Sequence, residues 1–152
     1  MHSNIYVLRE IKGNNKPMDF YGKSNINFDV VEDFADYIQD IPKECLEKEI
    51  KWLADNQKDF LTIEDKVITL SAKSAKDKLK HVFDRLNDAI EDNQDLWELQ
   101  YILNHKYGFR FLLVNDEGEI IDNLTLNELY YMCSCREGVN KFEIVGVVDY
   151  HY

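Results

Sequence analysis

The clearest alternation of apolar and polar residues along the chain lies between positions 109 and 122. It is interrupted by turn-forming polar residues at 115–118, a pattern typical of a β-hairpin with a four-residue loop. Short runs of β-favouring residues over 4–11 and 141–150 predict one strand near each end of the chain.

The last predicted strand is apolar on both faces near its centre, so we expect it to be covered on both sides. Strict alternation assigns Phe142, Ile144 and Val148 to one face and Val145 and Val147 to the other. Gly146 within this strand marks a bulge or a close approach of another backbone segment.

Helical spacing of apolar residues begins in the first half of the chain. It extends over 30–41, where Asp29 and Glu32 resemble a capping pair, and this predicts a first helix. The proline that follows can open a second helix over 42–55. Residues 60–70 fit either a hairpin or a single strand after a turn.

Three further helices are predicted in the second half of the chain. Each begins with a capping pair: Ser74 with Asp77, Asp95 with Glu98, and Thr125 with Glu128. The first continues to Ile90, the second ends before Gly108, and the third ends before Gly138. Because the first two are joined by a short polar break, we expect them to pack antiparallel.

These elements predict an α+β fold. A small, mainly antiparallel sheet, formed by the N-terminal strand, the 109–122 hairpin and the C-terminal strand, packs with four to five helices. The length of 152 residues and the lack of a linker fit a single domain over 1–152. A hydrophobic content of 45% excludes a mainly disordered chain.

The chain shows no signal peptide and no apolar run near the roughly 20 residues that span a bilayer. Three cysteines are an odd number, which fits thiols kept reduced inside a cell. We therefore expect a cytoplasmic protein.

The net charge of −11 argues against a surface that binds nucleic acid or an anionic membrane directly. The acids are not spread evenly. Residues 29–65 hold twelve acids and four lysines, and residues 84–98 hold six acids and one arginine. Between these segments, residues 71–80 are basic, with four lysines and one aspartate.

Two groups of these acids are candidate binding residues for a basic protein surface. They are Asp29, Glu32, Asp33, Asp36 and Asp40, on one face of the first predicted helix, and Asp84, Asp88, Glu91 and Asp92. The like charges of the first group repel at helical spacing. A solvated face that keeps the protein soluble is one account of this cost, and an interface for a basic protein surface is the other. Mimicry of duplex DNA would require both groups to share one side of the fold.

The leading functional hypothesis is a non-enzymatic inhibitor that docks on a basic surface of a nucleic-acid-acting protein. Phage anti-defence proteins of the anti-CRISPR kind and immunity proteins against toxin nucleases are examples of this class. A structural subunit of a larger assembly is an alternative, suggested by the C-terminal tyrosines Tyr130, Tyr131, Tyr150 and Tyr152. The sequence leaves the oligomeric state open.

No catalytic or cofactor-binding motif is present, and we expect neither a cofactor nor a metal. Cys133-Ser134-Cys135 lacks the spacing of a zinc site and is more typical of packing. An enzyme that uses Cys135 with His81 or His105 as base, or a carboxylate pair in a cleft, is the remaining alternative. We expect Asp149 and His151 to be frayed with the C-terminus.

Overall fold

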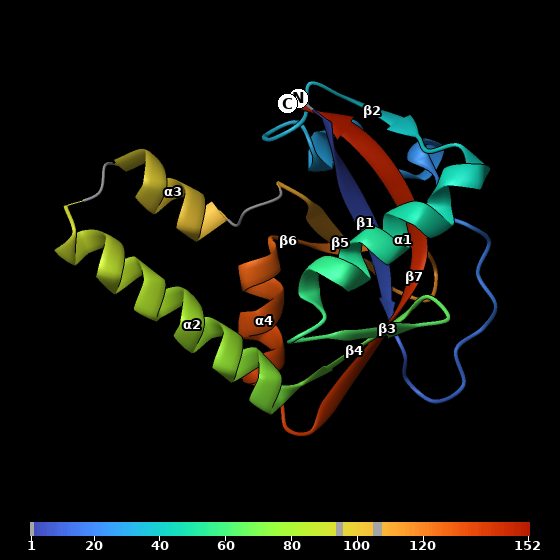
Figure 1. Ribbon diagram of the computed structural model, residues 1–152. Coiled ribbons are helices and arrows are strands. Elements are labelled where there is room, and N and C mark those ends of the chain that lie inside the picture. The colour runs from blue at the N-terminus through green and yellow to red at the C-terminus, as the bar shows by residue number, and fades with distance from the viewer. Residues whose placement is uncertain (1, 94–95, 105–107) are drawn as a thin grey trace.

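The computed structural model describes residues 2–93, 96–104 and 108–152. It has the predicted α+β fold, in which a mixed, mainly antiparallel sheet of seven strands packs with helices (Figure 1). In chain order the elements are β1 (His2–Glu10), the 3-10 turns η1 (Lys23–Asn25) and η2 (Phe28–Val30), β2 (Tyr37–Asp40), α1 (Lys43–Gln57), β3 (Thr62–Glu64), β4 (Val67–Ser71), α2 (Ala72–Glu91), α3 (Leu96–Asn104), β5 (Arg110–Val114), β6 (Ile120–Leu124), α4 (Leu126–Ser134) and β7 (Val139–His151).

Strand β7 is the longest strand and joins the parts of the sheet. One of its edges pairs with β1, whereas its other edge is shared by β4 at residues 139–143 and β2 at residues 148–151. Strand β1 also pairs in parallel with β5, and β6 lies beyond β5. The sheet therefore runs in the order β3-β4-β7-β1-β5-β6, with β2 also on β7.

A β-bulge interrupts the pairing of β7 with β1. Val7 is paired with Gly146 and Leu8 with Ile144, so Val145 is an extra residue on β7. Because side chains of a strand alternate between faces, one extra residue changes the face of every residue that follows it.

The bulge overturns part of the predicted alternation in β7. Phe142 and Ile144 share a core cluster with Val147, whereas Val145 and Val148 lie in a second cluster on the other face. The predictions that Val148 faces with Phe142, and Val147 with Val145, are therefore wrong. The prediction that β7 is covered on both faces is confirmed, because all of these residues are buried.

A second backbone segment packs directly on the bulge. The Tyr21 N–H donates to the Val145 carbonyl oxygen at 2.7 Å, and a Cβ added to Gly146 would lie 2.2 Å from the Tyr21 carbonyl oxygen. Residue 146 therefore has no room for a side chain, and the expected bulge and close approach both occur. The Tyr21 hydroxyl donates to the carbonyl oxygens of Asn25 and Gly118, which ties the chain after β1 to the sheet.

Two apolar cores cover the two faces of the sheet. On one face, α1, α4 and the N-terminal part of α2 pack on the strands, and Leu53, Leu129 and Phe109 are completely buried there. On the other face the cover is the irregular segment 18–38, which buries Val31 and its neighbours against β1, β5 and β7.

The helix predicted over 30–41 does not form. This stretch contains the end of η2, a turn and β2, and Asn27 caps η2 by accepting a hydrogen bond from the Asp29 N–H. The helical spacing arises because Val31, Phe34 and Ile38 all pack on the same apolar cluster, although the backbone that carries them is a turn followed by a strand. Strand β2 takes the edge of β7, whose backbone groups need hydrogen-bond partners.

Several other predicted elements are confirmed. They include α1, the 109–122 hairpin, and α4 with a reciprocal capping box between Thr125 and Glu128. Residues 60–70 contain a hairpin, β3–β4, rather than a single strand. Its turn residues Asp65 and Lys66 have positive φ angles, as a tight hairpin turn requires.

Helices α2 and α3 lie side by side and run in opposite directions, as predicted (Figure 1). Helix α2 starts earlier than expected, because the side chain of Ser71, not Ser74, accepts the capping hydrogen bond. The predicted cap Asp95 lies outside the described residues. Within the described ranges, no helix is long and apolar enough to cross a membrane.

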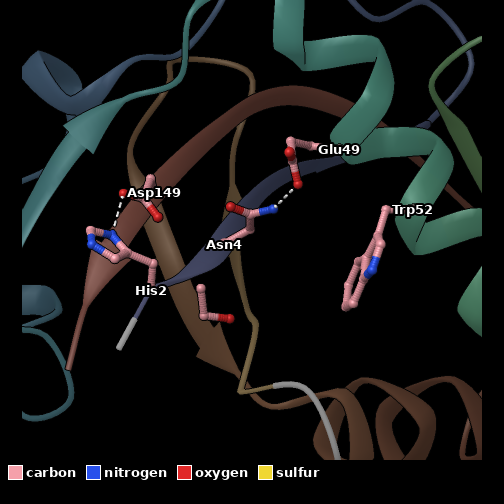
Figure 2. A pocket seen from close by; sticks show the side chains of 6 residues that line it. His2, Asn4, Glu49, Trp52 and Asp149 are labelled. Carbon is pink, nitrogen blue, oxygen red and sulfur yellow. Dashed lines mark hydrogen bonds and ion pairs between the residues drawn. The ribbon is translucent and has the colours of Figure 1, made fainter.

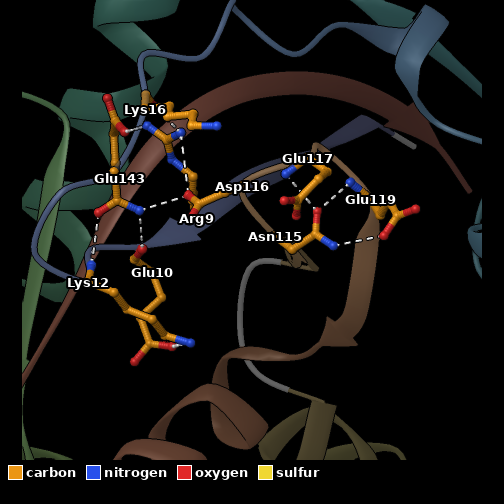
Figure 3. Close-up of polar contacts among 10 residues, drawn as sticks. Arg9, Glu10, Lys12, Lys16, Asn115, Asp116, Glu117, Glu119 and Glu143 are labelled. Carbon is orange, nitrogen blue, oxygen red and sulfur yellow. Dashed lines mark hydrogen bonds and ion pairs between the residues drawn. The ribbon is translucent and has the colours of Figure 1, made fainter.

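A buried arginine joins two loops to β1. Arg9 is 4% exposed, and its guanidinium donates to the Lys16 carbonyl oxygen and the Glu143 carboxylate, both at 2.6 Å (Figure 3). The Asp116 carboxylate lies 3.7 Å away. Because a buried charge is costly without partners, these contacts hold the loop after β1 and the β5–β6 loop near the sheet.

We predict that Gly146→Ala destabilises the fold by about 3 kcal/mol, because the new Cβ must displace the Tyr21 backbone. Gly13→Ala is the matched control. Gly13 has a positive φ but nothing within 4 Å, so its replacement costs only about 1 kcal/mol of backbone strain. Urea denaturation measures both, and equal losses of stability would contradict the steric account.

Candidate protein-binding site

The five acids predicted on the first helix lie instead on the irregular segment and β2. Asp29, Glu32, Asp33, Asp36 and Asp40 are all exposed. The backbone that carries them is held by burial of Val31 and Ala35 and by a 2.7 Å hydrogen bond from the Asp36 N–H to the His151 carbonyl oxygen. Exposed carboxylates are thus presented from a segment attached to the sheet. We call residues 29–40 the acidic segment.

Three of these carboxylates have polar partners within the protein. Asp36 lies 3.2 Å from His151 Nδ1, and Asp40 accepts a hydrogen bond from the Lys23 N–H at 2.7 Å. Asp29 accepts a hydrogen bond from the Asn27 side-chain amide at 3.3 Å. The salt bridges among the described residues include none from Asp29, Glu32 or Asp33, and all three side chains are exposed. Arg110 lies close by on β5, but its guanidinium packs over the Phe34 ring at 4.6 Å.

The second group of predicted acids lies elsewhere. Asp84, Asp88, Glu91 and Asp92 are exposed on and just after the C-terminal half of α2. That helix packs on the face of the sheet that is opposite to the acidic segment, and its C-terminal half projects past the sheet (Figure 1). The structure therefore does not bring the two groups together, and the geometric condition for duplex mimicry is not met.

A polar pocket that the sequence pattern did not predict lies between α1 and the first residues of β1 (Figure 2). It has a volume of about 290 Å³ and is lined by His2, Ser3, Asn4, Glu49, Trp52 and Asp149. The Asn4 amide donates to the Glu49 carboxylate at 2.7 Å, and His2 Nδ1 lies 2.9 Å from the Asp149 carboxylate.

Asp149 reaches this pocket because of the bulge in β7. It lies on the face of Val147, and without the extra residue it would point to the opposite side of the sheet. The Gln39 amide on β2 also donates to the Asp149 carboxylate at 2.6 Å. The expectation that Asp149 and His151 are frayed is therefore wrong, because β1 and β2 pair with this end of β7.

The pocket is suited to a cationic group. Asp149 and Glu49 supply acceptor oxygens, and Trp52, which packs edge-on against Phe109, supplies an aromatic wall. The side chain of Asp149 is 16% exposed. The sequence carries one hint of this position: Asp149 is an acid that comes three residues after Gly146, where a bulge was expected.

The cysteine candidates differ strongly in environment. Cys133 is fully buried, and burial raises the pKa of its thiol to about 11, whereas Cys135 is exposed at the end of α4. His81 stacks on Phe60, and His105 lies outside the described residues. In the described part of the chain, no three His, Cys, Asp or Glu side chains are grouped as metal ligands.

Comparison of the chain with protein-family models, curated proteins and solved structures found no match.

We predict that iodoacetamide at pH 8 alkylates Cys135 and leaves Cys133 intact in the native protein. The thiolate is the reactive form, and a pKa raised to about 11 leaves Cys133 protonated at that pH. Peptide mass spectrometry gives the site of modification, and urea-unfolded protein serves as the control in which both react. Equal labelling of both thiols in the native protein would contradict the buried position of Cys133.

Proposed function

We propose that this protein is a non-enzymatic binding protein that uses the acidic segment to dock on a basic surface of a nucleic-acid-acting protein and inhibits it. The observation that carries the proposal is the set of exposed carboxylates on Asp29, Glu32 and Asp33, which have no ion-pair partner among the described residues. Buried Val31 lies between them and attaches their backbone to the core.

Attachment to the sheet supports a binding role in energetic terms. A segment that is already ordered loses little conformational entropy when a partner binds, so more of the contact energy remains as affinity. The exposed carboxylates give a local negative potential that accelerates encounter with a basic surface. Such association is fast and weakens as salt is added.

Strand β2, at the edge of the sheet, connects the acidic segment to the wall of the polar pocket on the other face. Asp36, which directly precedes β2, contacts His151, and Gln39 on β2 contacts Asp149 in the pocket wall. The proposed docking surface is therefore the acidic segment, and the pocket lies on the opposite face of the sheet.

Basic surfaces of this kind are typical of proteins that bind phosphate backbones. A protein docked there competes with the nucleic acid, which is why we propose inhibition. The acidic segment lies apart from the acids of α2, so the proposed recognition relies on the shape and charge of the acidic segment. It does not rely on mimicry of duplex DNA, in which the phosphate charges are spaced by about 1.7 Å along the axis.

The proposal predicts that Asp29→Asn, Glu32→Gln and Asp33→Asn together weaken partner binding by about tenfold or more. The matched control is Asp84→Asn, Asp88→Asn and Glu91→Gln, which removes the same charge from α2. Immobilised wild type and both triple variants are used to capture proteins from a host lysate, and captured proteins are identified by mass spectrometry. Affinities of the purified partner are then measured by calorimetry at several salt concentrations.

The supporting result is a nucleic-acid-binding protein that the wild type and the α2 variant capture, that salt releases, and that duplex DNA or RNA displaces. The acidic-segment variant fails to retain it while keeping the circular dichroism spectrum of the wild type. Equal retention by both variants, or an affinity that does not change with salt, would refute docking through the acidic segment.

A further inference from the structure

Helix α2 carries an apolar stripe that the subunit covers at only one end. Leu79, Phe83, Leu86 and Ile90 share one side of the helix, because they are spaced by three or four residues. Leu79 packs on the core, but Phe83 is 65% exposed and Ile90 is 56% exposed. The exposed part lies in the half of α2 that projects past the sheet (Figure 1).

The neighbouring helix does not cover this stripe. Buried Ala89 of α2 and Ile102 of α3 line the same small hollow between the two helices. Ala89 and Ile90 are consecutive, so their side chains point about 100° apart around the helix axis. Helix α3 therefore packs beside the stripe and leaves Phe83 and Ile90 open.

The charges of α2 are divided between its two halves. Lys73, Lys76, Lys78 and Lys80 outnumber Asp77 in the N-terminal half. In the C-terminal half Asp84, Asp88 and Glu91, followed by Asp92, outnumber Arg85. This order is opposite to the one the helix dipole favours, since anions are stabilised at the N-terminus and cations at the C-terminus. The first turn contains no acid and the last turn no base.

Repulsion within α2 adds to this unfavourable arrangement. Lys76 and Lys80 are four residues apart, as are Asp84 and Asp88, and such like-charged pairs each cost some tenths of a kcal/mol, whereas Lys80 and Asp84, also four apart, attract. Lys78 faces Phe60 and Asp59 of its own subunit. The salt bridges among the described residues include none from Lys76, Lys80, Asp84 or Asp88, so these exposed charges are open to a second surface.

We propose that a second copy of this chain packs antiparallel on the open stripe of α2, so that the basic half of each helix faces the acidic half of the other. The two-fold axis passes near Phe83, which packs on Leu86 of the second copy. Leu79 then faces Ile90, and Lys76 faces Glu91. By symmetry each of these contacts occurs twice.

Charge complementarity identifies the occupant as the protein itself. In an antiparallel pair, the side chains that flank the stripe on one side meet the same flank of the other helix, and Lys76 and Glu91 lie on one such flank. The two helix dipoles also oppose each other, so each acidic half lies beside the positive end of the other helix. Helix α2 is about 30 Å long, and the part of its stripe that is open for this contact lies in the C-terminal half, because the N-terminal half packs on the core of its own subunit.

This dimer leaves the acidic segment free, because that segment covers the opposite face of the sheet. The inference is therefore independent of the proposed docking function. It assigns a different role to Asp84, Asp88, Glu91 and Asp92. These acids lie opposite the lysines of a second copy and do not bind the basic partner protein.

Analytical ultracentrifugation across a concentration series tests the dimer. We expect the wild type to dimerise, and Lys76→Glu or Glu91→Lys alone to raise the dimer dissociation constant about tenfold or more, since each places two like-charged pairs in the interface. The double variant K76E/E91K restores opposite charges and should return the dissociation constant close to that of the wild type. Lys48→Glu, on the exposed face of α1, has the same charge change as K76E and should leave the dimer intact.

Circular dichroism and thermal unfolding of each variant confirm that the subunit is folded before its association is interpreted. A wild type that remains monomeric up to millimolar concentration would overturn the proposal. A K76E/E91K variant that associates no better than either single variant would overturn the antiparallel pairing in the same way.

Discussion

The packing of a backbone segment against the bulge at Gly146 determines how the rest of the molecule is arranged. The bulge turns the end of β7 so that Asp149 faces α1, and the missing side chain lets Tyr21 hydrogen-bond to Val145. A residue with a Cβ at this position would clash with the Tyr21 backbone. The bulge thus helps to position features on both faces of the sheet: the polar pocket on one face, and the segment that carries the acidic residues on the other.

This arrangement divides the acids behind the net charge of −11 between two surfaces. The acidic segment and the C-terminal half of α2 lie on opposite sides of the sheet, so they act as two separate surfaces. On the acidic segment no lysine or arginine salt bridge among the described residues offsets the carboxylates. On α2 the acids follow a run of lysines in the same helix, and in the proposed dimer the two halves of that helix complement those of the second copy.

Local chemistry made much of the fold predictable. Thr125 and Glu128 predict a helix start, because their reciprocal capping hydrogen bonds join residues only three positions apart. The polar loop at 115–118 predicts a hairpin in the same local way. Strand β2 was not predictable, because Val31, Phe34 and Ile38 have helical spacing while the strand depends on distant β7. The pocket was missed for a related reason: the face of Asp149 depends on how many residues the bulge inserts.

Native-state amide hydrogen exchange tests most directly whether the acidic segment is a surface built on β7. The account predicts that the amides of Tyr21, Ala35 and β2 are protected together with those of β7, as parts of one cooperative unit. Exchange of residues 21–40 at the rate of an unstructured peptide, while β1 and β7 remain protected, would contradict it.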